Sequence, residues 1–248
     1  MLLLRTSRTA LETHCYVLAA GAGGPAVVVD PGAGAGQSLP PLLAEHGLTV
    51  GAVVVTHGHA DHLWDAAEVA GGAPVHLAGP DLYRMSDPAG ALGELGEYFR
   101  RLTGTAWREP ETTRPFPAGW LEGGGDEVVP GVVVRAVPAP GHTEGSAVLL
   151  VRATLAPTDV RPADILPRGV LAPDGPTEVL LGLCGDVLFA GSMGRTDLPG
   201  GDEREMLSTL RTLASALPPE TVLLPGHGPS TTLSAELATN PYLRRATG

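Results

Sequence analysis

The stretch Thr56-His57-Gly58-His59-Ala60-Asp61-His62 places three imidazoles and one carboxylate within six residues, directly after the apolar run Ala52–Val55. Chance does not readily explain such a density of metal-binding side chains in a chain with 8 histidines among 248 residues. His57 and His59 lie two residues apart in an extended turn and can face one ion. Asp61 and His62 begin a helix and point toward a neighbouring ion. The stretch therefore predicts a metal site and disfavours a turn of ordinary polar residues.

Three further ligand candidates follow predicted strands elsewhere in the chain, where they stand beside glycine. They are His142 in Pro140-Gly141-His142-Thr143, Asp186 in Cys184-Gly185-Asp186, and His227 in Pro225-Gly226-His227-Gly228. Taken singly, each is typical of a turn or cap residue. A first cluster of ligands close in sequence rarely completes a site alone, so together these residues predict one centre. Imidazole and carboxylate ligands favour Zn²⁺, and also Fe or Mn, over Ca²⁺ and Mg²⁺.

Asp30 ends a predicted buried strand in Val29-Asp30-Pro31-Gly32, close to where the ligand loops should converge. Its carboxylate can hydrogen-bond a ligating histidine from behind, and a plain turn aspartate is the competing interpretation. The remaining histidines have no partner at ligand spacing. His14, His46 and His76 are therefore interpreted as structural.

The chain has the composition of a globular α/β protein, with 43% hydrophobic and 17% charged residues. We predict one domain over residues 1–248, with strands at Ala26–Asp30, Ala52–Val55, Val132–Val137, Ala147–Val151, Glu178–Leu183 and Val222–Leu224. Helices are predicted over Leu39–His46 with Ser38 as its cap, over Leu63–Ala70 opened by Asp61, and over Arg204–Leu217. Residues 79–125 are predicted to form an insertion of the kind that makes lids or substrate loops, and residues 152–177 a surface excursion.

The net charge and the N-terminal residues argue against a nucleic-acid-binding protein and against a secreted or membrane-spanning one. The net charge is −11, all sixteen basic residues are arginine, and none of them forms a basic block, which disfavours a nucleic-acid partner. The apolar run in Met1-Leu2-Leu3-Leu4-Arg5 is too short for a signal-peptide core, and no stretch reaches the length of a membrane span. A cytoplasmic protein is expected, in which Cys15 and Cys184 are reduced, buried thiols.

With these residues the sequence resembles the metallo-β-lactamase superfamily, and within it the single-domain branch of glyoxalase II-like (hydroxyacylglutathione hydrolase-like) enzymes. The resemblance covers nearly the whole chain. Besides the histidine-rich stretch, it is carried by Gly185–Gly201, by Leu224-Pro225-Gly226-His227-Gly228-Pro229 and by Asn240-Pro241-Tyr242-Leu243.

The resemblance implies a four-layer αββα sandwich with two divalent metal ions at one edge. In that arrangement His57, His59 and His142 hold the first ion, Asp61, His62 and His227 hold the second, and Asp186 bridges both. Zn²⁺ is the first expectation, with Fe or Mn as alternatives. A hydroxide shared by the ions would attack an acyl carbonyl while a thiolate leaves, and Asp61 would also orient that hydroxide.

Several positions depart from the family pattern near the expected mouth of the site. Leu63-Trp64-Asp65 stands where the family usually has a Gly-Gly pair, and Glu144 replaces the usual Pro after His142-Thr143. We expect Trp64 and Asp65 to reshape the mouth. The chain also ends near Tyr242 without the helical C-terminal domain that binds glutathione in full-length glyoxalase II, which puts recognition of that thiol in doubt.

The expected function is hydrolysis of a small-molecule thioester, with Arg195 meeting a substrate carboxylate. A persulfide dioxygenase with a single Fe is the first alternative, and a lactone hydrolase is the next. A β-lactamase is less favoured, because a seven-ligand set with a bridging Asp186 is not the β-lactamase arrangement. A non-catalytic binding protein is also less favoured, because no ligand is missing.

Overall fold

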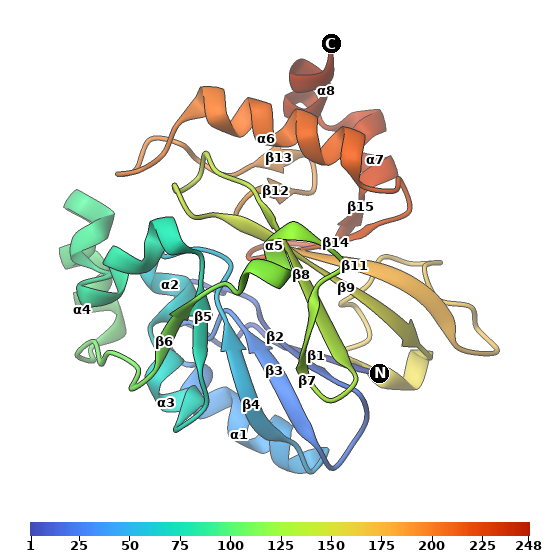
Figure 1. Cartoon of the computed structure of the whole chain (residues 1–248), viewed down its shortest axis with the longest axis horizontal. Coiled ribbons are helices and arrows are strands. Elements are labelled where there is room, and N and C mark those ends of the chain that lie inside the picture. The colour runs from blue at the N-terminus through green and yellow to red at the C-terminus, as the bar shows by residue number, and fades with distance from the viewer.

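Two mixed β-sheets lie face to face, and helices cover the outer face of each, as the computed structural model of residues 1–248 shows (Figure 1). The first sheet has the order β10 (Val160–Arg161), β1 (Leu2–Thr6), β2 (Cys15–Ala19), β3 (Pro25–Val29), β4 (Thr49–Val54), β5 (Val75–Leu77) and β6 (Thr113–Pro115). The second has the order β15 (Thr231–Thr232), β14 (Val222–Pro225), β11 (Thr177–Gly185), β9 (Ala147–Leu155), β8 (Val132–Pro138) and β7 (Asp126–Val129). A small hairpin joins β12 (Leu188–Phe189) and β13 (Ser192–Met193).

The helices are divided between the two outer faces (Figure 1). The first sheet is covered by α1 (Ala35–Glu45), α2 (Ala60–Leu63) and α3 (Ala66–Ala70), with α4 (Gly96–Thr103) and the 3₁₀ segments η1 (Gly79–Ser86) and η2 (Gly90–Leu95) beside them. The second sheet is covered by α6 (Glu203–Ala216), α7 (Leu233–Thr239) and α8 (Pro241–Thr247). Two short elements, α5 (Ala118–Glu122) and η3 (Pro157–Asp159), complete the chain. None of these helices combines the length and the apolar character that a bilayer span requires.

Alternating side chains on the strands build three apolar layers. In β3, Val27 and Val29 point into the core between the sheets, whereas Ala26 and Val28 point toward the helices of the first outer layer. A third cluster lies between the second sheet and α6 with α8, and includes Leu210. Because successive side chains of a strand point to opposite faces, a strand covered on both faces is a continuous apolar run. The predicted αββα layering is confirmed.

Helix α6 follows the sequence prediction closely. The Asp202 side chain accepts hydrogen bonds from the backbone N–H groups of Arg204 (2.7 Å) and Glu205 (2.9 Å), so the helix starts with an N-cap. It ends at Ala216, just before Pro218, which has no N–H and cannot continue a helix.

The two other predicted helices differ from the structure at their starts. Helix α1 begins at Ala35, so Ser38 lies inside it, and the predicted cap is wrong. The backbone N–H groups of Gly34 (2.7 Å) and Gly36 (3.0 Å) donate instead to the carboxylate of Asp65. The predicted helix over residues 63–70 is two short helices, α2 and α3, which meet at Asp65. A capping group that arrives from 29 residues away cannot be found by a search for local caps.

Residues 79–125 and 152–177 contribute more to the fold than the sequence indicated. β6 is an edge strand of the first sheet, so the segment 79–125 is not wholly an insertion. The middle of 152–177 is not a surface excursion, because β10 pairs with β1 while Ile165 and Leu166 are buried between the sheets. These elements are too short to show a hydrophobic period. Short length also hid β1, which the sequence analysis treated only as an inadequate signal peptide.

Candidate metal centre

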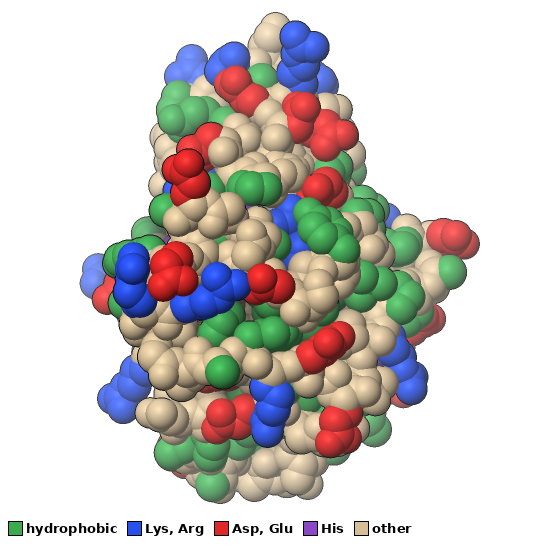
Figure 2. Space-filling view, turned by 90° about the vertical axis from the view of Figure 1, so that its left-hand side faces the viewer, with side chains coloured by type: hydrophobic (Ala, Val, Ile, Leu, Met, Phe, Trp, Pro, Cys, Tyr) green, Lys and Arg blue, Asp and Glu red, His purple; other side chains and the backbone are tan.

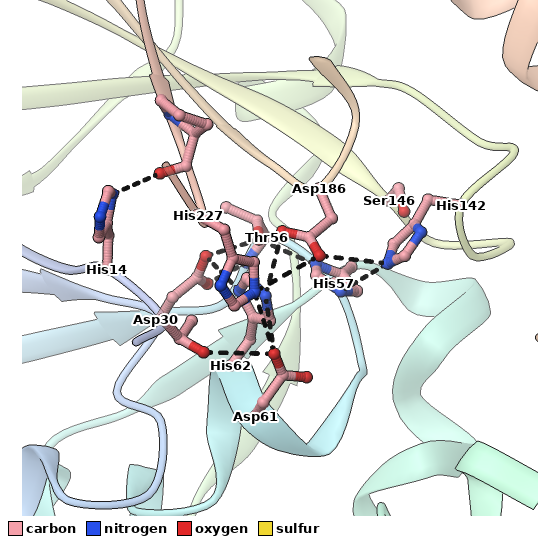
Figure 3. Close-up of polar contacts among 12 residues, drawn as sticks. His14, Asp30, Thr56, His57, Asp61, His62, His142, Ser146, Asp186 and His227 are labelled. Carbon is pink, nitrogen blue, oxygen red and sulfur yellow. Dashed lines mark hydrogen bonds and ion pairs between the residues drawn. The ribbon is translucent and has the colours of Figure 1, made fainter. Parts of the chain in front are cut away.

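The seven predicted ligands meet at one edge of the sandwich, and all of them except His59 are labelled in Figure 3. His57 and His59 lie on the loop after β4, Asp61 and His62 on α2, His142 between β8 and β9, Asp186 after β11, and His227 after β14. We call them the seven-residue cluster. They form three overlapping groups, in each of which the candidate ligand atoms lie within 4.8 Å of one another. The groups are His57 with His59 and His142, His57 with His62 and Asp186, and Asp61 with His62 and His227.

Hydrogen bonds on the far sides of two rings fix which nitrogen faces the centre. Thr56 Oγ1 donates to Asp30 Oδ2 (2.7 Å), so it can accept from His57 Nδ1 (3.2 Å). His142 Nδ1 donates to the Arg195 carbonyl oxygen (2.7 Å). Both Nε2 atoms then carry lone pairs, and they lie 3.2 Å apart. Two facing lone pairs in a buried site fit a cation bound between them.

The other half of the centre shows the same feature. His62 Nδ1 donates to Asp30 Oδ2 (3.0 Å), which leaves Nε2 directed at Asp186 Oδ1, 3.3 Å away. Both of these atoms are buried, and neither has a hydrogen-bond partner. A buried polar atom without a partner is costly in a folded protein unless an ion or water satisfies it. The donor set therefore fits a metal ion in this half as well.

Asp186 lies between the two halves. Its Oδ1 faces His62, and its Oδ2 lies 3.8 Å from His142 Nε2 and 3.6 Å from His227 Nε2. His227 Nε2 in turn lies 3.2 Å from Asp61 Oδ2. One carboxylate therefore reaches imidazoles of both halves, which is the geometry that a bridging ligand needs.

Electrostatics in the cluster favour cations. Burial, together with the neighbouring imidazoles, lowers the pKa of His57 well below its usual range, and burial lowers the pKa of His59 to about 3. These rings are neutral at pH 7, which is the form that coordinates a metal. Burial opposes the charged form of His62 too, but the carboxylates of Asp186 and Asp61 outweigh it and raise its pKa well above the ordinary value. The cluster thus concentrates negative potential in a buried place.

Arg195 supports the site through its backbone. Its carbonyl accepts from His142, while its guanidinium donates two hydrogen bonds of 2.7 Å to Asp197. The side chain is 51% exposed, so it lies at the surface with an internal partner already in place. Contact between this side chain and a substrate carboxylate stays a prediction.

Two of the residues that depart from the family pattern stabilise helices instead of shaping the mouth. Trp64 is buried, packs edge-on against Phe99 of α4, and donates from its indole N–H to Thr105 Oγ1 (2.8 Å). Asp65 binds the start of α1, as described above. The expectation that these two residues reshape the mouth is wrong. Glu144, two residues beyond His142, is 42% exposed and pairs with the buried Arg84.

The sequence analysis missed a group that supports the second half of the centre. Thr13 Oγ1 donates to Asp61 Oδ2 (3.2 Å), and the backbone N–H of His14 donates to the carbonyl of Gly226 (2.7 Å). The ring of His14 lies against the carbonyl of Pro225, with 3.1 Å between its Nδ1 and that oxygen (Figure 3). His14 is structural, as predicted, and what it holds is the loop of His227. The His14 contacts join residues that are about two hundred positions apart and the Thr13 contact spans 48 positions, so no local pattern marks them.

Comparisons with known sequences place the chain among metal-dependent hydrolases. The model of the metallo-β-lactamase superfamily matches residues 8–154. An uncharacterised protein of Mycobacterium tuberculosis is 36% identical over 236 residues, which cover 94% of this chain and 93% of that protein. The hydroxyacylglutathione hydrolase GloC of Haemophilus influenzae is 27% identical over 220 residues, which cover 88% of this chain and 87% of that protein.

Solved structures show the same architecture. BLEG-1, a B3 metallo-β-lactamase, has a TM-score of 0.70 and 28% identity, with coverage of 98% of this chain and 99% of that one. TTHA1623 in a di-iron-bound form has a TM-score of 0.61 and 30% identity, with coverage of 93% and 94%. The fold predicted from the sequence is therefore confirmed.

Proposed function

This chain belongs to the metallo-β-lactamase superfamily, and from its complete seven-residue cluster we propose that it hydrolyses small-molecule thioesters with two divalent metal ions. The observation that carries the proposal is the position of Asp186, whose carboxylate reaches imidazoles of both halves: Oδ1 lies 3.3 Å from His62 Nε2, and Oδ2 lies 3.8 Å from His142 Nε2 and 3.6 Å from His227 Nε2. A site with a single ion would leave one of these groups of donors without a function.

The protein supplies the ligands and their orientation. His57, His59 and His142 would hold one ion, Asp61, His62 and His227 the other, and Asp186 both. Ions held there would lower the pKa of a bound water toward about 7 and would polarise a carbonyl oxygen. The Asp61 carboxylate is fixed by Thr13 and faces His227, so it can also accept a hydrogen bond from the attacking hydroxide and orient it.

The thioester preference is supported by the hydroxyacylglutathione hydrolase of Haemophilus influenzae, which aligns over most of both chains. The choice of metal rests on the chemistry of the ligands and on one related structure. Imidazole and carboxylate ligands suit Zn²⁺, while the di-iron form of TTHA1623, at 30% identity, keeps iron in consideration. We propose Zn²⁺ as the working metal and Fe as the alternative.

A small-molecule substrate also fits the surface. The chain carries a net charge of −11, and basic and acidic side chains alternate across the face in Figure 2 without forming a basic patch there. Some of these residues pair with each other, as Arg100 does with Asp87 at 2.7 Å. An electrostatic surface of this kind gives no support to binding of a phosphate backbone.

The experiment combines metal analysis of the purified protein with a panel of substrates. Two ions per chain and release of free thiol from lactoylglutathione or another low-molecular-weight thioester support the proposal. One Fe per chain with oxygen uptake in the presence of a persulfide would replace it with a dioxygenase. Faster turnover of lactones or of a chromogenic β-lactam than of any thioester would contradict the substrate class and leave the metal centre in place.

A further inference from the structure

A buried aspartate lies between the two loops that carry the three-histidine half of the centre. Asp81, in η1, is 0% exposed. Its Oδ2 accepts from the backbone N–H of Gly58 (2.6 Å) and from Thr143 Oγ1 (2.7 Å), and its Oδ1 accepts from the backbone N–H of Gly145 (2.8 Å). Gly58 separates His57 from His59, and Thr143 follows His142. One carboxylate therefore joins the two segments that supply all three imidazoles.

The two donor glycines are required by this close approach. A Cβ on Gly58 would lie 3.1 Å from Asp81 Cβ and 2.4 Å from Arg84 Cδ. A Cβ on Gly145 would lie 2.6 Å from Asp81 Cγ. Both distances to Asp81 are tighter than ordinary carbon contacts, so the carboxylate packs directly against backbone that has no side chain. Gly58 and Gly145 therefore leave the space that the Asp81 carboxylate occupies.

Arg84 supplies the counter-charge. It is fully buried, its Nε lies 3.4 Å from Asp81 Oδ1, and its Nη2 donates to Glu144 Oε2 (2.6 Å) and to the carbonyl of Pro199 (2.8 Å). A buried carboxylate needs such a partner to remain charged. The same arginine links the His142 loop, through Glu144, to the loop that contains Arg195, whose carbonyl orients the His142 ring.

We propose that Asp81 is the positioning residue of the three-histidine half, which fixes His57, His59 and His142 relative to one another through Gly58, Thr143 and Gly145. The inference rests on the proposed metal centre and goes beyond it. None of the hydrogen bonds of Asp81 is made to Asp61, to His62 or to the loop of His227. Thr13 contacts Asp61, His14 contacts the His227 loop, and Asp30 contacts His62 as well as Thr56 beside His57. Loss of the Asp81 carboxylate should therefore weaken one half of the centre selectively.

The substitution Asp81→Asn keeps the size of the side chain and replaces one oxygen by an amide N–H₂. In either orientation that donor faces a backbone N–H or a hydroxyl hydrogen that is already donating. Glu236→Gln is a matched control. Glu236 is 3% exposed and also accepts three hydrogen bonds, from Gly191 N (2.8 Å), Thr231 Oγ1 (2.7 Å) and Asn240 Nδ2 (2.8 Å), but it touches no ligand loop of the three-histidine half.

The readout is Co²⁺ content and the visible absorption spectrum of the Co²⁺-loaded full-length protein, challenged with graded chelator. For Asp81→Asn we expect one Co²⁺ to be lost at about 10- to 100-fold lower chelator than in the wild type, with the other retained. Glu236→Gln should retain both as the wild type does. Wild-type retention in Asp81→Asn, or equal losses in both variants, would overturn the inference.

A milder variant covers the case in which Asp81→Asn does not fold by circular dichroism. Thr143→Val removes one of the three hydrogen bonds to Asp81 and should release the same ion at severalfold lower chelator, with the same change in the spectrum. Unchanged release would overturn the inference. A folded wild-type protein that binds no Co²⁺ would contradict the proposed function itself, so the two failures are distinguishable.

Discussion

His62 Nε2 and Asp186 Oδ1 lie 3.3 Å apart in the buried centre, and neither atom has a hydrogen-bond partner. Asp30 holds the far side of the His62 ring, so the ring presents Nε2 to this gap. A pair of this kind is stable when a cation satisfies both atoms. The centre is thus organised around ions.

Removal of the bridging carboxylate tests that organisation. We expect Asp186→Ala to lower the metal content below two ions per chain and to reduce thioester turnover at least about 100-fold, because both halves lose a ligand. Elemental analysis and thiol release measure the two effects on the same preparation. Full activity with two ions in this variant would remove the dinuclear proposal.

Asp30 offers a test of the support behind the ligands. Its carboxylate accepts from Thr56 N (2.7 Å), Thr56 Oγ1 (2.7 Å) and His62 Nδ1 (3.0 Å), at a backbone φ of 54°. Asparagine tolerates this left-handed conformation about as well as aspartate does, so Asp30→Asn changes the hydrogen bonds and leaves the backbone in place. We expect about 10- to 100-fold weaker metal binding, measured by chelator competition. Binding at wild-type strength would show that Asp30 is an ordinary turn residue.

The ligands could be found from the sequence because each of them follows a strand, either in a short turn or, for Asp61 and His62, on the short helix α2. The spacing of His57, His59, Asp61 and His62 is local, and glycine marks the turns of His142 and His227. A search for ligand chemistry at strand ends finds such residues whatever the details of the packing.

The supporting residues could not be found in this way. Asp81 binds Gly145 across 64 positions, and Thr13 binds Asp61 across 48. Their side chains are common in turns, so nothing local separates them from ordinary turn residues. Asp81 did leave one sequence signal, the glycines at 58 and 145 beside the ligands, but its meaning appears only when the loops are in contact.

Metal removal should destabilise the whole protein. Each ion that binds only the folded state adds about 2.7 kcal/mol at a free concentration of 100 times Kd, which for a chain of this size corresponds to a shift in Tm of about 5–10 °C per ion. We therefore expect chelator to lower Tm by at least that amount and added Zn²⁺ to restore it. Thermal denaturation followed by circular dichroism measures the shift. An unchanged Tm after complete metal removal would argue that the cluster holds no ion.

Substitutions of Trp64 should change the stability of the protein and leave its metal binding intact. Its ring is 4% exposed, packs against Phe99 with 5.1 Å between ring centroids, and hydrogen-bonds Thr105, so it fixes α4 beside the site. Trp64→Ala should lower the free energy of unfolding by about 3–5 kcal/mol, because a large cavity replaces the indole. Trp64→Phe keeps part of the packing and loses the hydrogen bond and the volume of one ring, so a smaller loss of about 1–2 kcal/mol is expected. Urea denaturation gives both values, and both variants should still bind two ions at temperatures where they are folded. Loss of metal from folded Trp64→Phe would mean that this ring acts on the centre after all.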